Sequence, residues 1–361
     1  MADPSLEVPS GPRLTAAQRR SLRPPLRRRI GHGGLLLLWL VLLAAGLLGL
    51  AAAAVGVGPD RVDEAGAVLV STALAWALAA RTGGRPVIFS VLALVVGAGI
   101  VALDRDELRT GAAVVTAVLA AVFGVMATVP ARRFPQAARE TVLAVVIGAI
   151  GTVAALGYHP VLTVARFQYA VLACAFVGAF LLVYRLGAGL HGLGRRGVLV
   201  VVVGGLMLAV TLLYAELIRR YGSPGLISAI QDALAWCRGH LDGYPRPIEA
   251  LLGIPSLAWG AHMRARRRQG WWVCAFGVAL TGPVACTMLN ADIGVLEALA
   301  SLGYSLLVGL LIGFVVIRID LALTGNPSRG DAHRPVGRRA AREAEDASAV
   351  RPEPGRTHAL L

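Results

Sequence analysis

Residues 34–57 read GLLLLWLVLLAAGLLGLAAAAVGV, an apolar run without a single charged side chain. The hydrocarbon core of a bilayer is about 30 Å thick, and a helix needs roughly 20 apolar residues to cross it. The run is also too long for the apolar core of a secretory signal peptide. The sequence therefore predicts a retained transmembrane helix near the N-terminus.

Further apolar runs follow along the chain, separated by short loops that carry arginine. With 56% apolar and 16% charged residues, the 361-residue chain is too hydrophobic for a soluble domain of this size. In lipid, only helices and closed barrels satisfy every backbone polar group. We predict an all-α, polytopic helical integral membrane protein with about ten transmembrane helices. The later runs are centred near Leu74, Leu94, Ala120, Ile147, Phe176, Leu206, Leu257, Gly277 and Leu307.

The loop arginines predict the orientation of the chain. The segment 248–263 is short and contains Glu249, Gly253 and Pro255, so its own composition does not decide whether it spans the membrane. If it spans, the arginines of 264–268 lie on the same side as the N-terminal arginines and the C-terminal tail. The positive-inside rule favours that arrangement. We therefore expect ten helices with both termini in the cytoplasm.

The chain divides into three predicted regions. Residues 1–33, rich in Arg and Pro, and the charged residues 319–361 are expected to be disordered cytoplasmic tails. Residues 34–318 form the transmembrane bundle. Within it, the segment 218–247 is expected to lie outside the membrane, because residues 226–241 carry one apolar stripe beside polar faces. Whether this helix lies on the membrane or spans it stays open.

Composition also excludes several functions. The net charge of +14 would suggest nucleic-acid binding in a soluble protein, but here the arginines cluster at helix ends and in the tails, so no nucleic-acid partner is expected. All 35 basic residues are Arg, which excludes a Schiff-base or P-loop lysine. The string Gly187-x-Gly189-x-x-Gly192 follows a predicted helix rather than a strand, so it is not a dinucleotide site. No cofactor is expected.

Two predicted helices are interrupted near the C-terminal end of the bundle. Broken membrane helices expose carbonyl groups and helix ends that can bind substrates or ions, although proline kinks healed by neighbouring helices are commoner. Glu297 lies in the first turn of the last predicted helix and is a further candidate ligand. The candidate substrate-binding residues are Gly253, Pro255, Gly282, Pro283 and Glu297.

Two basic clusters in the predicted cytoplasmic loops are candidates for binding phosphate or anionic phospholipid head groups. Trp271 and Trp272 follow the second cluster and are expected to anchor the chain at the membrane interface. The candidate residues are Arg195, Arg196, Arg264, Arg266, Arg267 and Arg268.

Asp104 and Asp106 lie in a predicted external loop and are weak candidates for a metal or catalytic site. Asp104 and Glu107 also have the spacing of a helix N-cap and its third residue, which predicts a capping box instead. We favour capping, and no metal site is predicted.

Two stretches are similar to sequences of a known kind. Residues 185–197, RLGAGLHGLGRRG, and residues 264–277, RARRRQGWWVCAFG, resemble uncharacterised multi-pass membrane proteins of actinobacteria. The resemblance covers the membrane part and not the tails. It implies a plasma-membrane location and brings no activity and no site residue.

The first functional hypothesis is a permease or flippase for a small solute or lipid in a bacterial plasma membrane. One alternative is a non-catalytic assembly partner in an envelope complex. A second is a membrane enzyme acting on polyprenyl-linked substrates. The chain is also a possible homo-oligomer. The enzyme is the least favoured of the three. In each case the lipid bilayer is the expected surrounding.

Overall fold

All regular structure in the described part of the chain is helical. The computed structural model describes residues 26–161, 164–186, 199, 202–206, 208–210, 213, 221, 223–266, 270–281, 294–324 and 353–360. For these residues the all-α prediction is confirmed. The elements are α2 (Leu26–Ala54), α3 (Val62–Arg81), α4 (Pro86–Leu103), α5 (Asp106–Met126), α6 (Phe134–Leu156), α7 (Val164–Arg185), α9 (Pro224–Leu241), the π-helical η2 (Ile248–Gly253), α10 (Ile254–Arg264), α11 (Gly270–Ala275), the 3₁₀ helix η3 (Phe276–Leu280) and α13 (Val295–Thr324).

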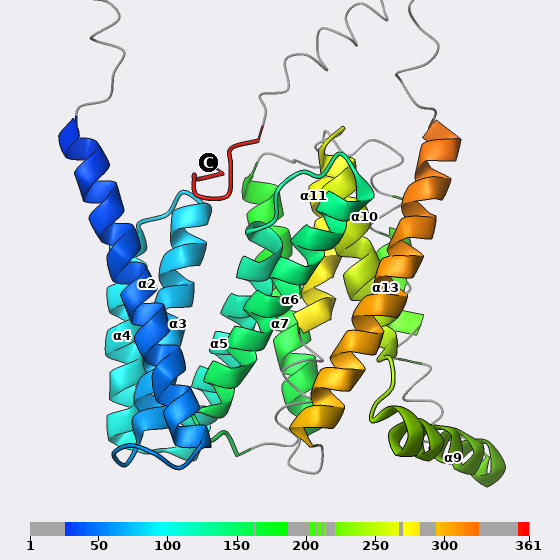
Figure 1. Cartoon of the computed structure of the whole chain (residues 1–361), viewed down its shortest axis with the longest axis horizontal. Coiled ribbons are helices and arrows are strands. Elements are labelled where there is room, and N and C mark those ends of the chain that lie inside the picture. Colours follow the sequence, from blue (N-terminus) through cyan, green and yellow to red (C-terminus); the bar gives the residue numbers. More distant parts are fainter. Residues whose placement is uncertain are drawn as a thin grey trace, which may run out of the picture.

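Seven helices in the described ranges are long and apolar enough to cross a membrane, namely α2, α3, α4, α5, α6, α7 and α13. The pairs η2–α10 and α11–η3 are shorter and lie within the same bundle (Figure 1). The predicted membrane-embedded character is therefore supported. The helices α2 and α13 extend beyond the predicted bundle boundaries, residues 34 and 318.

The outermost helices show why the bundle requires lipid. On α4, large apolar side chains such as Val87, Phe89 and Val95 are exposed. Both α2 and α4 pack on α3, whose side chains are mostly buried (Figure 1). Soluble proteins rarely expose contiguous apolar surface of this extent. The α2 and α4 helices thus face lipid, and α3 lies in the interior.

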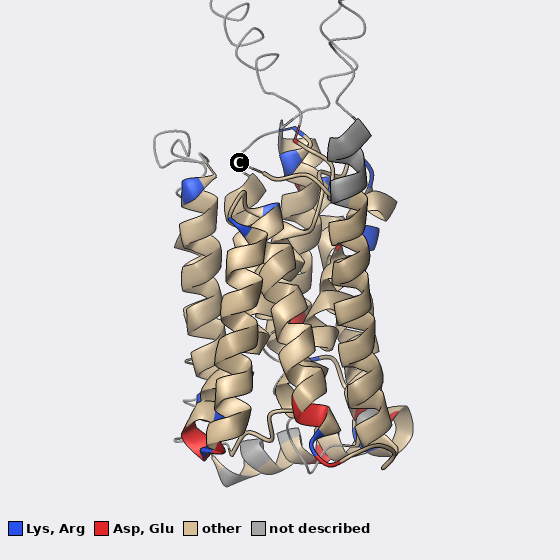
Figure 2. Ribbon diagram, turned by 90° about the vertical axis from the view of Figure 1, so that its left-hand side faces the viewer, with Lys and Arg blue, Asp and Glu red and all other residues tan. Residues whose placement is uncertain are grey.

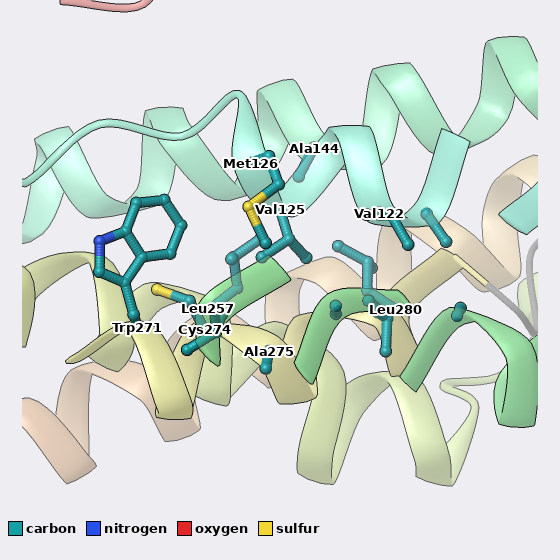
Figure 3. Packing of buried hydrophobic residues seen from close by; sticks show 14 of the residues in the cluster. Val122, Val125, Met126, Ala144, Leu257, Trp271, Cys274, Ala275 and Leu280 are labelled. Atoms are coloured by element: carbon teal, nitrogen blue, oxygen red, sulfur yellow. The ribbon is translucent and has the colours of Figure 1, made fainter. Parts of the chain in front are cut away.

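The core is packed from small residues and a few large ones. Figure 3 shows Val125, Met126, Leu257, Trp271 and Leu280 in one buried cluster that joins α5, α10, α11 and η3. The small-residue stripe Gly309-x-x-x-Gly313 on α13 packs inside the same bundle. A Cβ added to Gly309 would lie 2.6 Å from the Cβ of Ile254. Close helix approach of this kind is typical of membrane bundles.

The two ends of the bundle differ in charge. Figure 2 shows most basic segments at the end where the C-terminus lies and most acidic segments at the opposite end. We call the end that carries Arg81, Arg133 and Arg264 the basic end, and the end that carries Asp63 and Asp104 the acidic end. The N-terminal end of α2 and the C-terminal end of α13 both lie at the basic end (Figure 1).

The predicted interfacial helix is present as α9, which begins at Pro224. It lies beside the acidic end and across the direction of the bundle helices (Figure 1). Two contacts fix it to α13: Arg238 pairs with Glu297 at 2.8 Å, and the Tyr304 hydroxyl donates to the Leu241 carbonyl at 3.0 Å. The helix is not among the membrane-length apolar helices of the described chain.

The C-terminal region differs from the expected uniformly disordered tail. Residues 353–360 lie against the basic end of the bundle, and the Leu360 N–H donates to the Arg81 carbonyl at 2.8 Å. Composition suggested disorder because the region has no apolar periodicity, but buried arginines of the bundle supply partners that a single segment of sequence does not reveal.

Candidate functional site

The helix predicted to break at Gly253 and Pro255 stays helical there but changes from π to α geometry. Residues Ile248–Gly253 form π-helical turns, and α10 begins at the next residue, with Pro255 in its first turn. Proline has no backbone N–H, so a carbonyl of the preceding turn loses its helical partner, and the helix adjusts locally. The π-turns are frequent at functional sites. The binding role of Gly253 and Pro255 stays a prediction.

The η2 segment packs directly on a second irregular segment, η3. A Cβ added to Gly253 would lie 2.4 Å from the backbone nitrogen of Leu280 and 2.7 Å from its Cα, so only glycine fits. The predicted second break, Gly282 and Pro283, lies outside the described residues. The helix already leaves α geometry before it, since Phe276–Leu280 is a 3₁₀ helix.

A fully buried carboxylate lies in the π-helical turn. Glu249 is 1% exposed. The Arg246 guanidinium and the Ser305 hydroxyl are its polar neighbours. Within the described chain, however, neither carboxylate oxygen has a hydrogen bond of normal geometry. A buried charge without a close partner is destabilising by several kcal/mol in order of magnitude, so its presence here points to a role other than stability.

The segment before η2 holds Glu249 in this position. The Tyr244 N–H donates to the Ser301 hydroxyl at 3.2 Å, and the Arg246 N–H donates to the Ser305 hydroxyl at 2.8 Å. Both serines belong to α13 and are buried. These bonds fix the chain against α13 immediately before the π-helical turns begin.

Glu297 is in the first turn of α13, as predicted, and pairs with Arg238 of α9. It lies about 12 Å along α13 from Ser305 at 1.5 Å per residue. The structure therefore separates Glu297 from Glu249, while Gly253 and Pro255 lie on the same short run as Glu249. Its role as a substrate ligand stays a prediction.

The acidic end holds the predicted weak metal candidates in ion pairs. Asp104 pairs with Arg109 at 2.7 Å and with Arg61 at 3.1 Å, and Arg109 also pairs with Glu64. No group of three potential metal ligands occurs among the described residues. The capping-box prediction for Asp104 is wrong: α5 begins at Asp106 with Arg105 at its N-cap, and Asp104 is instead the left-handed C-cap of α4.

The basic end buries one of the predicted lipid-contact arginines. The Arg264 side chain has no exposed surface, and its guanidinium donates to the Thr128 hydroxyl at 2.7 Å and to the Thr128 carbonyl at 3.1 Å. It also lies 3.4 Å from the ring centroid of Trp271. Trp271 and Trp272 are both buried, so the interface-anchor prediction for them is wrong. Trp271 instead forms a cation–π contact inside the bundle.

The other predicted lipid-contact arginines divide into two groups. Arg266 is exposed and pairs with Asp320 at 2.8 Å. Arg195, Arg196, Arg267 and Arg268 lie outside the described residues. Of the two described candidates, Arg266 has the exposure that contact with a lipid head group requires.

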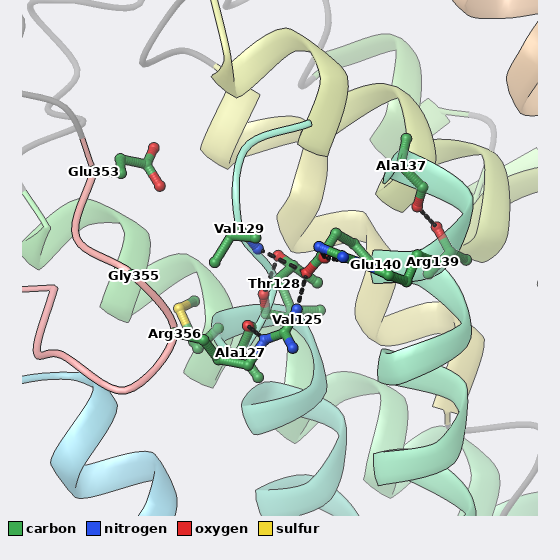
Figure 4. A network of polar contacts seen from close by, with 12 residues as sticks. Val125, Ala127, Thr128, Val129, Ala137, Arg139, Glu140, Glu353, Gly355 and Arg356 are labelled. Atoms are coloured by element: carbon green, nitrogen blue, oxygen red, sulfur yellow. Dashed lines mark hydrogen bonds and ion pairs between the residues drawn. The ribbon is translucent and has the colours of Figure 1, made fainter. Parts of the chain in front are cut away.

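Arg81 and Glu140 complete the buried polar network at the basic end. Arg81 donates to the Met126 carbonyl at 2.9 Å. Glu140 accepts from the Val129 N–H at 3.0 Å (Figure 4). The last carbonyls of α5 have no helical partner and carry partial negative charge, which favours guanidinium groups near them. Arg81 binds one of these carbonyls, that of Met126, and Arg264 binds Thr128, two residues beyond α5.

The sequence missed Glu249, Arg81 and Glu140 as functional candidates. Glu249 had a signal, because an acidic residue stands four positions before a Gly-x-Pro break in an apolar run. Arg81 and Glu140 had none, since each stands next to a loop, where charged residues are usually solvated.

Comparison of the chain with protein-family models, with curated proteins and with solved structures gave no match.

Proposed function

We propose that this protein is a permease or flippase that moves a small solute or lipid across a bacterial plasma membrane. One observation carries the proposal: Glu249 is fully buried in a π-helical turn that packs against a second irregular helix. Ionisable groups within membrane bundles are rare and mark substrate or ion pathways. Departures from α geometry such as the π-helical turns of η2 are frequent at functional sites.

We further propose ten crossings with both termini in the cytoplasm. The seven long helices would supply seven crossings, the pairs η2–α10 and α11–η3 two, and the run near Leu206 the tenth. The connections between α2 and α7 alternate between the two ends (Figure 1), and the basic end carries the start of α2 and the C-terminal segment 353–360. The positive-inside rule then assigns the basic end to the cytoplasm.

The orientation can be tested through Cys237 on α9, which is partly exposed beside the acidic end. An impermeant thiol reagent should label it in intact cells, and the variant Cys237→Ser should lose that label. The buried Cys274 should stay unlabelled in folded protein. Labelling of Cys237 only after the membrane is opened would contradict the proposed orientation.

The transport hypothesis can be tested by substituting Glu249. A strain lacking the gene is compared with its parent for lipids, cell metabolites and exported metabolites, and is then complemented with each variant. Glu249→Gln should insert in the membrane at wild-type levels and resist thermal unfolding as well as the wild type, yet leave the metabolite difference uncorrected. Thermal stability is measured because removing a buried charge that has no close partner should not destabilise the bundle.

Two controls make this result specific. Glu107→Gln removes an exposed carboxylate from the first turn of α5 and should restore the parental profile fully. The double variant Asp104→Asn with Asp106→Asn should also restore it. Full complementation by Glu249→Gln would contradict the permease proposal, and failure of the aspartate variant alone would favour the membrane-enzyme alternative.

A further inference from the structure

The C-terminal segment 353–360 binds across the basic end of the bundle. Its Glu353 carboxylate pairs with Arg264, with 2.5 Å between Oε2 and Nη2 and 3.3 Å between Oε1 and Nε. Arg81 donates to the carbonyls of Gly355 and His358 at 2.8 and 2.7 Å. Arg356 pairs with Glu140 at 2.6 Å (Figure 4). The Leu360 side chain packs against the main buried cluster.

The hydrogen bonds that the two buried guanidinium groups form with the bundle all go to neutral oxygens, although the buried Glu140 carboxylate lies near enough to Arg81 to act on it electrostatically. Arg81 and Arg264 are 3% and 5% exposed. Arg81 donates to the Met126 and Thr128 carbonyls, and Arg264 donates to the Thr128 hydroxyl and carbonyl. Within the described chain, Glu353 is the one carboxylate that pairs with either arginine. Desolvated cations are strongly destabilising unless an anion compensates them. The pair therefore forms a positively charged site that requires an anion.

The way Glu353 binds shows what chemistry the site accepts. Both carboxylate oxygens meet the Arg264 guanidinium, one on Nε and one on Nη2. This two-point geometry is shared by carboxylate and phosphate groups, and arginine recognises both through it. Arg81 has no carboxylate in an ion pair with it in the described chain. It binds the segment 353–360 by donating hydrogen bonds to two backbone carbonyls.

We infer that Arg81 and Arg264 form a binding site for the carboxylate or phosphate group of an anionic molecule, and that the C-terminal segment 353–360 occupies this site as an intramolecular competitor. Release of the segment opens the site, and binding of the anion keeps the segment away. A ligand tethered to its own site acts at an effective concentration that can reach about millimolar. External anions should therefore displace it at about millimolar concentration or above. This inference does not depend on the transport proposal.

Hydrogen exchange on the full-length protein in lipid nanodiscs tests the occupancy of the site. In the wild type, peptides covering 353–361 should exchange slowly, because the Leu360 and His358 N–H groups are hydrogen-bonded. Glu353→Gln should speed this exchange by about tenfold or more, since it removes the charge of the pair. Glu345→Gln removes the same charge from the same C-terminal region and should leave the exchange of 353–361 unchanged. Fast exchange in the wild type, or no effect of Glu353→Gln, would overturn the inference.

The second arm tests the anion and its source. Sodium phosphate and sodium succinate are titrated against sodium chloride of equal ionic strength, in nanodiscs of zwitterionic lipid only. Either anion should speed the exchange of 353–361 by severalfold while chloride does not, and Glu353→Gln should show no further increase. Nanodiscs that contain phosphatidylglycerol should give the same acceleration without added salt if the lipid head group is the source. No response to phosphate, succinate or phosphatidylglycerol would show that the segment is a fixed part of the fold, and the anion site would be refuted.

Discussion

Arg264→Gln is expected to destabilise the bundle by about 2–4 kcal/mol, the range for breaking a buried charge pair and its hydrogen bonds. The substitution removes the hydrogen bonds that Arg264 donates to Thr128 and Glu353. It also removes the cation that lies on the Trp271 ring. Purified protein should then unfold at lower temperature and at lower denaturant, followed by tryptophan fluorescence, since Trp271 reports directly on the site.

A matched control stands two residues away. Arg266→Gln removes the same charge from an exposed side chain whose described partner is Asp320, and exposed pairs contribute about 0–1 kcal/mol. Arg264→Lys should fall between the two, because a lysine keeps the charge but not the planar fork of donors. Equal losses for Arg264→Gln and Arg266→Gln would show that the buried network does not stabilise the basic end.

Gly253→Ala is expected to disrupt the contact between the two irregular helices. The added Cβ would lie 2.4 Å from the Leu280 nitrogen, and backbone atoms cannot rotate away as a side chain can. Overpacking of this kind destabilises by about 1–3 kcal/mol, against which the gain in helix propensity is at most about 1 kcal/mol. The free energy of unfolding should fall, and complementation of the deletion strain should fall with it.

Gly99→Ala on α4 is the control for this substitution. No atom lies within 4 Å of the added Cβ, so the change should be neutral or slightly stabilising. If Gly253→Ala behaved like Gly99→Ala in both the stability and complementation measurements, the close packing of η2 on η3 would not matter to this protein.

Part of the candidate site could be predicted from the sequence. Gly253 and Pro255 indicate an irregular helix, because glycine and proline act on the local backbone wherever they occur. The burial of Glu249 could not be predicted from the sequence, because it depends on Ser305 and Arg246 and on the packing of η3 near η2. The capping role assigned to Asp104 failed for a related reason. Its spacing to Glu107 fits a capping box, but Arg109 and Arg61 pair with its carboxylate, and Arg61 lies far away in sequence, immediately before α3.

By itself the sequence determined that long apolar helices build this chain. Hydropathy and length are properties of each run alone, and lipid leaves the backbone of such a run almost no alternative to a helix. The sequence also indicated that the helix around Gly253 and Pro255 departs from α geometry, because glycine and proline act on the local backbone.

Only the tertiary structure decided which charges are buried and what they bind. Arg264 and Glu353 lie 89 positions apart, and nothing in either neighbourhood indicates the other. The same holds for Trp271. Its position beside several arginines predicts a place at the membrane surface, but the side chain is buried and packs against one of them, Arg264. Pairing between distant charges depends on how the helices pack together, and packing in lipid is governed by close fit and hydrogen bonds, which the apolar pattern of a run does not encode.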